Sequence, residues 1–389
     1  MTAARVARTP LAGAGSLAIL ALARLGVSLL GFAAVLLVAR ALAPAELGRW
    51  SLALAIQGYA LHLGEFGLRS VVTTEAAQAG RGLLARYLAL RLGLSVLALA
   101  ATLAGCALFR PDDLLLVGLA TASILPLALQ LDWLALVDGR DRLAAFLLLV
   151  RPLAFLLLLL ALPVPAGPVA VAASFLAAWT VAAIASWICL DRAWGPRGGP
   201  VPTAPAMLRR GAGIAAVTLS NQAQLSADLL AVGLVLGPAA AGDYYLAGQI
   251  LVAALVFANA AGQLALARRT ALRPDLGRLI GLALATALGL ALLAPPLLPR
   301  LFGAEHAGAA PILWWLLPWF VLTHATTLLQ AALTAAGREA AVLRANLLGL
   351  ALLAAGLAIA ALAPSAAAFA LARGLAEAAR LAFLWRLRP

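Results

Sequence analysis

Long apolar runs separated by short polar segments repeat from one end of the chain to the other. Most runs reach roughly 20 residues, the length at which a helix crosses a hydrocarbon core of roughly 30 Å. Arg, Asp, Gly and Pro mark the ends of the runs, as they do for helices. The pattern predicts an all-α fold with about twelve membrane-spanning helices, at residues 12–40, 47–68, 83–109, 113–137, 143–163, 167–190, 211–236, 241–266, 277–298, 308–334, 339–362 and 365–386.

Composition argues against a soluble fold. Of the 389 residues, 65% are hydrophobic and only 11% are charged, whereas a soluble domain carries roughly 25% charged residues. The chain is therefore predicted to be a polytopic integral membrane protein.

The distribution of charge predicts the orientation in the membrane. The net charge is +13, but the arginines lie in short clusters between apolar runs, which indicates membrane topology rather than nucleic-acid binding. Twenty-one of the 28 basic residues lie on the same side as the N-terminus and four lie opposite. The positive-inside rule then predicts a multi-pass protein with both termini in the cytoplasm. The arginines inside predicted spans are Arg24, Arg151 and Arg373.

Two similar halves make up the chain. A polar segment rich in Pro and Gly predicts an N-terminal six-helix lobe at 1–190, a cytoplasmic linker at 191–210 and a C-terminal six-helix lobe at 211–389. A shift of 194 residues lays Leu42–Trp50 on Leu236–Tyr244 and pairs prolines, glycines and aromatics. Both copies follow the first helix of a half, so we expect a pseudo-two-fold axis along the membrane normal and a cavity between the lobes.

Short motifs at helix ends carry a more specific signal. They are Leu37–Trp50, Gly64–Leu68 with Glu75, Asp132–Trp133 with Gly139–Arg140, Leu301–Glu305 and Ala335–Glu339. In this order they resemble the signatures of the O-antigen-flippase-like oligosaccharide flippases, in the multidrug/oligosaccharidyl-lipid/polysaccharide exporter superfamily.

The resemblance implies a flippase for a polyprenyl-diphosphate-linked oligosaccharide. Such a protein lies in the bacterial cytoplasmic (inner) membrane and moves its cargo from the cytoplasmic to the outer leaflet by alternating access, for surface polysaccharides such as the O-antigen of lipopolysaccharide. Candidate partners are this lipid, the membrane lipids, an H+ or Na+ coupling ion and polysaccharide assembly proteins. Relatives that export cationic drugs or flip the peptidoglycan precursor leave the choice of cargo open.

Two arginines inside the N-terminal spans are candidates for binding the diphosphate. A charge deep in the bilayer costs ~2.5–3.5 kcal/mol on insertion scales, so it needs a reason to be there. Guanidinium groups match phosphate oxygens with paired hydrogen bonds, which suits Arg24 and Arg151 to this role. The alternative is that they neutralise Glu65 and Asp132 between helices.

Polar side chains in the C-terminal half form a stripe. Asn221, Gln224 and Asp228 are spaced i, i+3 and i+7 on the seventh predicted helix, and Gln249 and Asn259 on the eighth extend it. The four amides are candidate glycan contacts, although amides suit helix–helix hydrogen bonds equally well. The candidate ion-coupling carboxylates are Glu65, Asp132 and Asp228.

Local spacing predicts two further arrangements. Arg373 and Glu377 lie four residues apart on the last helix and are expected to pair with each other. His62, Glu65 and Arg69 are spaced i, i+3 and i+7, which predicts that they share one helical face.

Other classes of function fit the sequence less well. It holds no catalytic constellation, metal-ligand cluster or nucleotide motif, so we expect neither an enzyme nor a cofactor. A membrane-embedded glycan polymerase or ligase usually carries a sizeable outer loop, whereas the outer loops here are about ten residues or fewer. A cation exporter of the same superfamily would need an acidic cavity. A scaffold would need no cavity chemistry at all.

Overall fold

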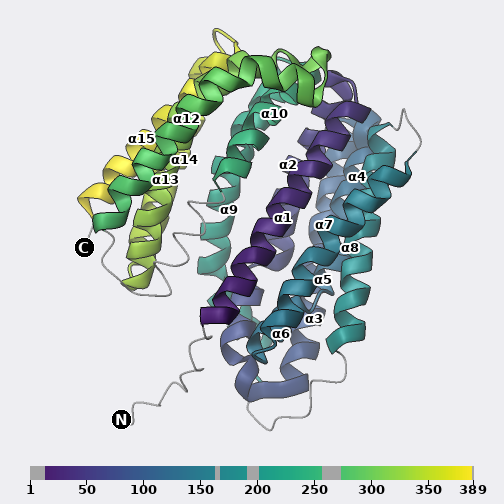
Figure 1. The fold of residues 1–389 in the computed structure, drawn as a ribbon. Coiled ribbons are helices and arrows are strands. Elements are labelled where there is room, and N and C mark those ends of the chain that lie inside the picture. The colour runs from purple at the N-terminus through teal and green to yellow at the C-terminus, as the bar shows by residue number, and fades with distance from the viewer. Residues whose placement is uncertain (1–13, 163–166, 191–200, 256–272, 388–389) are drawn as a thin grey trace.

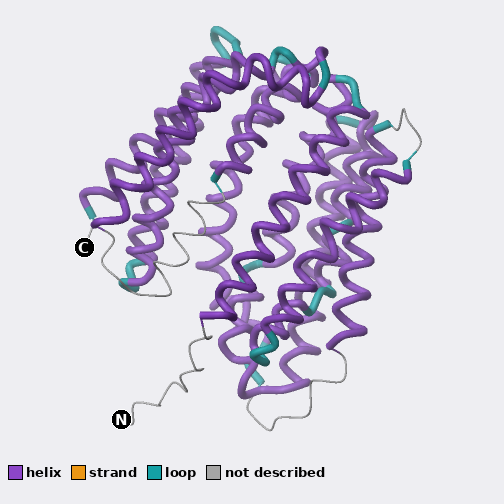
Figure 2. The backbone as a smooth tube through the Cα atoms, viewed as in Figure 1, coloured by secondary structure: helices purple, strands orange, loops and turns teal. Residues whose placement is uncertain are grey.

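Helices account for all the regular structure that the computed structural model describes, which covers residues 14–162, 167–190, 201–255 and 273–387 (Figure 2). The helices are α1 (Ala14–Ala41), α2 (Pro44–Glu65), α3 (Leu68–Phe109), α4 (Leu114–Ala122), α5 (Ile124–Ala128), α6 (Asp132–Val137), α7 (Asp141–Ala161), α8 (Pro168–Leu190), α9 (Ala204–Val235), α10 (Pro238–Ala254), α12 (Arg273–Phe302), α13 (Ala309–Ala335), α14 (Glu339–Ala360) and α15 (Ala366–Arg386). Two short 3-10 turns are η1 (Pro111–Asp113) and η3 (Ala304–His306).

The predicted fold class is confirmed. With α4, α5 and α6 taken as one interrupted span, the described residues form twelve long helical segments. Eight of these segments are long and apolar enough to cross a membrane. The other four are α2, α9, α10 and α15. They pack against one another and against other helices within the bundle, where polar side chains can face protein instead of lipid.

Two helices begin well before their predicted starts. α3 begins at Leu68 rather than at residue 83, although its membrane-spanning part is Gly82–Phe109. α9 begins at Ala204, inside the predicted linker at 191–210. Apolar periodicity marks only the immersed part of a helix, so the polar first turns went undetected.

The fourth predicted span, 113–137, is interrupted. Leu131 donates its backbone N–H to Ser186 Oγ at 3.1 Å, and Trp187 Nε1 donates to the Leu129 carbonyl at 2.8 Å. α8 therefore satisfies backbone groups that the break leaves without helical partners, and this makes an irregular segment tolerable at membrane depth.

The ends of α2 follow from local sequence. Pro44 occupies the first helical turn, and the Glu46 carboxylate accepts the Ala43 backbone N–H at 3.1 Å. At the other end, Phe66 (φ 45°) and Gly67 (φ 68°) adopt left-handed conformations and turn the chain into α3. The prediction that His62, Glu65 and Arg69 share one helical face is therefore wrong, because the turn separates Arg69 from the other two.

The repeated Pro–Gly motifs meet each other where α2 crosses α10. A side chain on Gly48 would overlap the Pro238 carbonyl oxygen, and one on Gly242 would overlap the Pro44 carbonyl oxygen. The contact is reciprocal between positions 194 residues apart, as expected for repeats related by a pseudo-two-fold axis.

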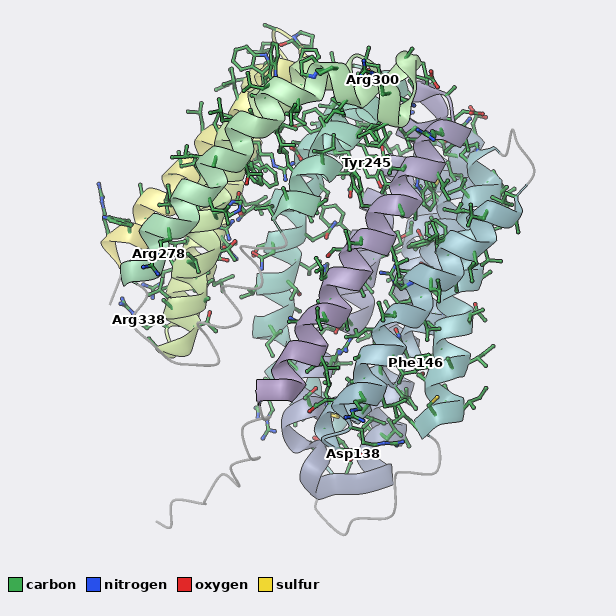
Figure 3. All side chains as sticks on the ribbon, in the orientation of Figure 1. Asp138, Phe146, Tyr245, Arg278, Arg300 and Arg338 are labelled. Carbon is green, nitrogen blue, oxygen red and sulfur yellow. The ribbon has the colours of Figure 1, made fainter. Side chains whose placement is uncertain are left out.

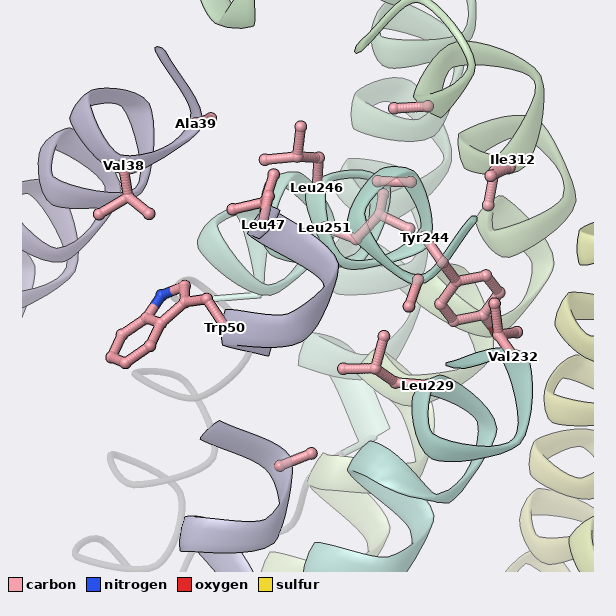
Figure 4. Close-up of a cluster of buried hydrophobic side chains, with 14 of the residues drawn as sticks. Val38, Ala39, Leu47, Trp50, Leu229, Val232, Tyr244, Leu246, Leu251 and Ile312 are labelled. Carbon is pink, nitrogen blue, oxygen red and sulfur yellow. The ribbon is translucent and has the colours of Figure 1, made fainter. Parts of the chain in front are cut away.

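The two groups of helices converge on one side of the molecule. We call the side where α1 begins and α15 ends the proximal side, and the opposite side distal. α12–α15 spread away from α1–α8 toward the proximal side and approach them on the distal side (Figure 1). A hydrophobic cluster with side chains from both groups and from α10 fills the region where they meet. Figure 4 shows part of it, with Val38 of α1, Leu47 and Trp50 of α2, and Tyr244 and Leu251 of α10.

Polar contacts tie the two groups together on the distal side. Arg40 Nε donates to the Leu301 carbonyl at 2.7 Å, and its Nη2 donates to the Arg300 carbonyl at 3.1 Å. His306 Nε2 lies 3.1 Å from the Ala39 carbonyl oxygen. We call these contacts, together with Asp243 beside His306, the distal latch.

Candidate functional site

Two small cavities adjoin each other between the halves. One, of about 180 Å³, is bordered by Arg373 and Gln222, and we call it the Arg373 pocket. The other, of about 140 Å³, is bordered by Arg151, and we call it the Arg151 pocket. Leu54 and Tyr245 line both, and Tyr245 lies between α10 and α1 (Figure 3). The two cavities are therefore neighbouring parts of one central site.

Arg151 stands near the middle of α7 and is half-buried. Its guanidinium carbon lies 4.6 Å from the centroid of the Trp179 ring on α8, within range of a cation–π interaction. Among the described residues it has no ion-pair partner. The guanidinium therefore borders the Arg151 pocket with its charge uncompensated by a carboxylate.

Arg24 lies on the face of α1 that borders the Arg151 pocket. It is exposed on α1, and the α1 positions seven and fourteen residues later, Gly31 and Val38, border the Arg151 pocket. Seven residues bring a helix back to the same face, roughly 10 Å further along its axis. Arg24 thus stands two turns nearer the proximal side than the pocket.

A charged cluster forms on the proximal side of α2, α3 and α6. Arg69 Nη2 lies 3.1 Å from Asp132 Oδ2, so Asp132 pairs with Arg69 and not with Arg24 or Arg151. Burial lowers the pKa of Arg69, but the charges of Asp132 and Glu65 outweigh burial, and the pKa is raised. Both carboxylates act on this one guanidinium.

Arg373 is compensated in a way that Arg151 is not. Asp228, which is 0% exposed, accepts hydrogen bonds through Oδ2 from Arg373 Nη1 at 2.7 Å and from the Tyr244 hydroxyl at 2.6 Å. The Arg373 guanidinium carbon also lies 3.7 Å from the centroid of the Trp319 ring. Asp228, a candidate ion-coupling residue, therefore already holds a cation.

The predicted pairing of Arg373 with Glu377 is wrong. Glu377 Oε2 instead bonds Arg380 Nη1 at 3.2 Å. The carboxylate of Asp228 on α9 is fully buried, and an unpaired charge there would cost several kcal/mol. Arg373 therefore pairs with Asp228 on α9 and not with Glu377 on its own helix.

The candidate glycan residues have different surroundings. Asn346 Nδ2 donates to Asn221 Oδ1 at 2.8 Å, and Gln224 Nε2 donates to the Asn346 carbonyl at 2.7 Å. Gln249 borders the Arg373 pocket, whereas Asn259 lies outside the described residues. Helix–helix bonding thus accounts for two of the four amides.

Sequence reasoning missed several residues of the site. Asn346 bonds α9 and also accepts from Gln330 Nε2 at 2.8 Å; its one signal was an amide inside an apolar run. Trp179 and Tyr245 gave no signal, because aromatics are common in membrane helices. The described residues contain no group of three His, Cys, Asp or Glu side chains able to hold a metal ion.

Several solved structures with a similar fold are membrane transporters. The chain is similar to the lipid II flippase MurJ in an inward closed conformation, with a TM-score of 0.72, 12% identity and coverage of 96% of this chain and 88% of that one. An inward-facing multidrug resistance MATE family transporter of the MOP superfamily matches with a TM-score of 0.65 and 16% identity, over 95% of this chain and 98% of that one. A MOP superfamily transporter from Pyrococcus furiosus is described as having a binding pocket of reverse polarity. It matches with a TM-score of 0.58 and 16% identity, over 96% of this chain and 95% of that one. At these identities the likeness shows the fold.

The family comparison is more specific. No curated protein matches the chain. The family described as polysaccharide biosynthesis protein matches residues 14–267, which is more than half of the chain, and the resemblance found in the motifs is confirmed. The chain therefore belongs to the polysaccharide biosynthesis protein family.

Proposed function

We propose that the chain translocates a polyprenyl-diphosphate-linked oligosaccharide from the cytoplasmic to the outer leaflet by alternating access, for cell-surface polysaccharide synthesis. One observation carries the proposal: Arg151 borders a cavity between the halves without an ion-pair partner among the described residues. A fixed cation in a low-dielectric site attracts an anion more strongly than it would in water. A diphosphate supplies that anion.

The arrangement of the two arginines suggests a route. Arg24 is exposed and nearer the proximal side, where its guanidinium meets the diphosphate first. Arg151 then holds it beside the central site. Gln222 and Gln249 border the adjoining Arg373 pocket and offer amides to sugar hydroxyls, while the polyprenyl chain stays in the lipid.

The proximal side is the cytoplasmic side in this proposal, because most arginines cluster there. Release into the outer leaflet then requires the distal latch to open and the proximal side to close. Of the three candidate ion-coupling carboxylates, Asp132 and Asp228 hold arginines. Glu65, half-buried beside Arg69, is the best candidate for binding H+ or Na+ during the return step.

Export of cationic drugs is the competing function, favoured by the fold shared with multidrug transporters. A cation-binding cavity would be lined by uncompensated carboxylates. The charged side chains that border the two pockets are Arg151 and Arg373, and Asp228 compensates the charge of Arg373, so the uncompensated charge is the positive one of Arg151. The polarity of the site therefore favours an anionic cargo.

Reconstitution tests the proposal. Leaflet exchange of a fluorescent polyprenyl-diphosphate oligosaccharide would be measured in proteoliposomes, beside efflux of a cationic dye from the same preparation. We expect lipid exchange without dye efflux, and loss of exchange in Arg151→Gln. Arg278→Gln is the matched control, because Arg278 is exposed on the proximal side at the start of α12 (Figure 3). Dye efflux without lipid exchange would refute the proposal.

A further inference from the structure

A third cavity lies away from the central site, in the distal half of the molecule. It measures about 370 Å³ and lies between α2, α3, α4 and α9. Its walls are mostly apolar, with Leu52, Ile56 and Val117 from the N-terminal half and Leu230 and Leu234 from α9. We call it the seam pocket.

The seam pocket opens toward lipid. Phe109 and Leu234, which border it, are 82% and 71% exposed, and large apolar side chains with that exposure on membrane helices contact acyl chains. Leu52 on α2 also packs over Gly233 of α9, so the two halves touch beside the pocket. A lipid chain in this pocket would contact both halves at once.

Charges of both signs stand at the distal rim. Arg49 Nε and Asp113 Oδ1 form an ion pair at 2.6 Å. Next to them Arg110 and Asp112 are exposed, and neither side chain has an ion-pair or hydrogen-bond partner among the described residues. The rim therefore offers one available cation and one available anion, with no net charge.

We propose that the seam pocket binds a zwitterionic aminophospholipid of the distal leaflet, such as phosphatidylethanolamine. An acyl chain fills the apolar pocket, the lipid phosphate pairs with Arg110, and the lipid ammonium pairs with Asp112. An acidic lipid such as phosphatidylglycerol satisfies Arg110 through its phosphate but brings no ammonium to pair with Asp112. A choline headgroup has no N–H to donate to that carboxylate. This role is separate from cargo transport.

Two glycines on α3 provide a matched pair of variants. A Cβ on Gly105, which borders the seam pocket, or on Gly93, which does not, would meet no atom within 4 Å. Gly105→Phe fills the pocket, whereas Gly93→Phe adds the same side chain elsewhere on the same helix. Native mass spectrometry of the purified proteins counts the phosphatidylethanolamine that each retains. We expect retention in Gly93→Phe and loss in Gly105→Phe; equal retention would overturn the proposal.

The headgroup is tested by adding lipids back. Phosphatidylethanolamine, phosphatidylglycerol and phosphatidylcholine with identical acyl chains are titrated into delipidated protein. We expect phosphatidylethanolamine to bind roughly tenfold more tightly than the others, the effect of one charge-assisted hydrogen bond. Arg110→Gln with Asp112→Asn should abolish this preference, while Arg300→Gln, another exposed distal arginine (Figure 3), should keep it.

Three results would overturn the headgroup assignment. They are equal binding of all three lipids, preference for phosphatidylglycerol, and displacement of phosphatidylethanolamine by a polyprenyl diphosphate. The last result would assign the seam pocket to the cargo. None of these binding results depends on whether the protein flips glycolipid, so the two proposals fail separately.

Discussion

The two halves each place an arginine against a tryptophan ring, but they treat its charge differently. In the C-terminal half, Arg373 lies over Trp319 and also pairs with Asp228 at 2.7 Å. In the N-terminal half, Arg151 lies over Trp179 and has no carboxylate partner among the described residues. The same fold can thus neutralise an intramembrane arginine or leave its charge available, and only the second kind is suited to bind an anion.

The energetics of the two sites follow from this difference. Breaking a buried ion pair by removing one partner typically costs about 3–5 kcal/mol, because the other charge remains buried. An arginine without a partner already carries its insertion cost of ~2.5–3.5 kcal/mol in the resting protein. We infer that Arg373 stabilises the fold, whereas Arg151 is retained for binding.

The largest expected effect comes from removing Asp228. Asp228→Leu leaves Arg373 buried without its partner, so the free energy of unfolding should fall by about 3–5 kcal/mol. The double variant with Arg373→Met removes both charges and should recover most of that loss. Denaturation in detergent micelles measures both. A double variant as unstable as the single one would show that the pair does not act as a unit.

Arg151→Met should separate transport from stability. Its unfolding free energy should stay level or rise, since a charge without an ion-pair partner is removed, while glycolipid exchange should fall at least about tenfold. Arg151→Lys should recover exchange only in part, because a lysine cannot form the paired hydrogen bonds of a guanidinium. Glycolipid exchange at the wild-type rate in Arg151→Met would show that Arg151, like Arg373, is not needed to bind the cargo.

These contrasts show where sequence reasoning succeeds and where it stops. The helices and the intramembrane arginines stand out because charge is rare in apolar runs. The sequence does not reveal which arginine is neutralised. Asp228 lies 145 residues from Arg373, and the near neighbour Glu377 looked like the better partner. The broken fourth span depends likewise on Ser186 and Trp187 of a distant helix. Local patterns predict elements, but long-range pairing decides the site.

The two repeats differ in how they compensate their arginines, but their backbones make equivalent contacts where α2 crosses α10. Gly48→Ala and Gly242→Ala each push a methyl group into a proline carbonyl of the other repeat, and each should lower the unfolding free energy by about 1–3 kcal/mol. Gly289→Ala on α12 is the control, because a Cβ there meets no atom within 4 Å. A large loss of stability in only one of the two variants would show that the two contacts at the crossing are not equivalent.

The smallest effect concerns the distal latch, where the C-terminal half holds a pair that pH can switch. Burial lowers the pKa of His306, but the carboxylate of Asp243 and the carbonyl of Ala39 outweigh burial, with Glu305 adding to them, and the pKa is raised above its usual 6.5. The ring nitrogens lie 3.5 Å from Asp243 Oδ1 and 3.1 Å from the Ala39 oxygen, both of which are acceptors. Only the protonated ring carries a proton on both nitrogens, and its positive charge attracts the Asp243 carboxylate.

Because the pKa is raised in the folded protein, the stabilisation from His306 is complete below about pH 6.5 and is lost as pH rises through the raised pKa. His306→Gln should remove this pH dependence, an effect of about 1 kcal/mol or less. Thermal unfolding of both proteins between about pH 6 and pH 8 measures it. An identical pH slope in the two proteins would show that His306 stays neutral over this pH range.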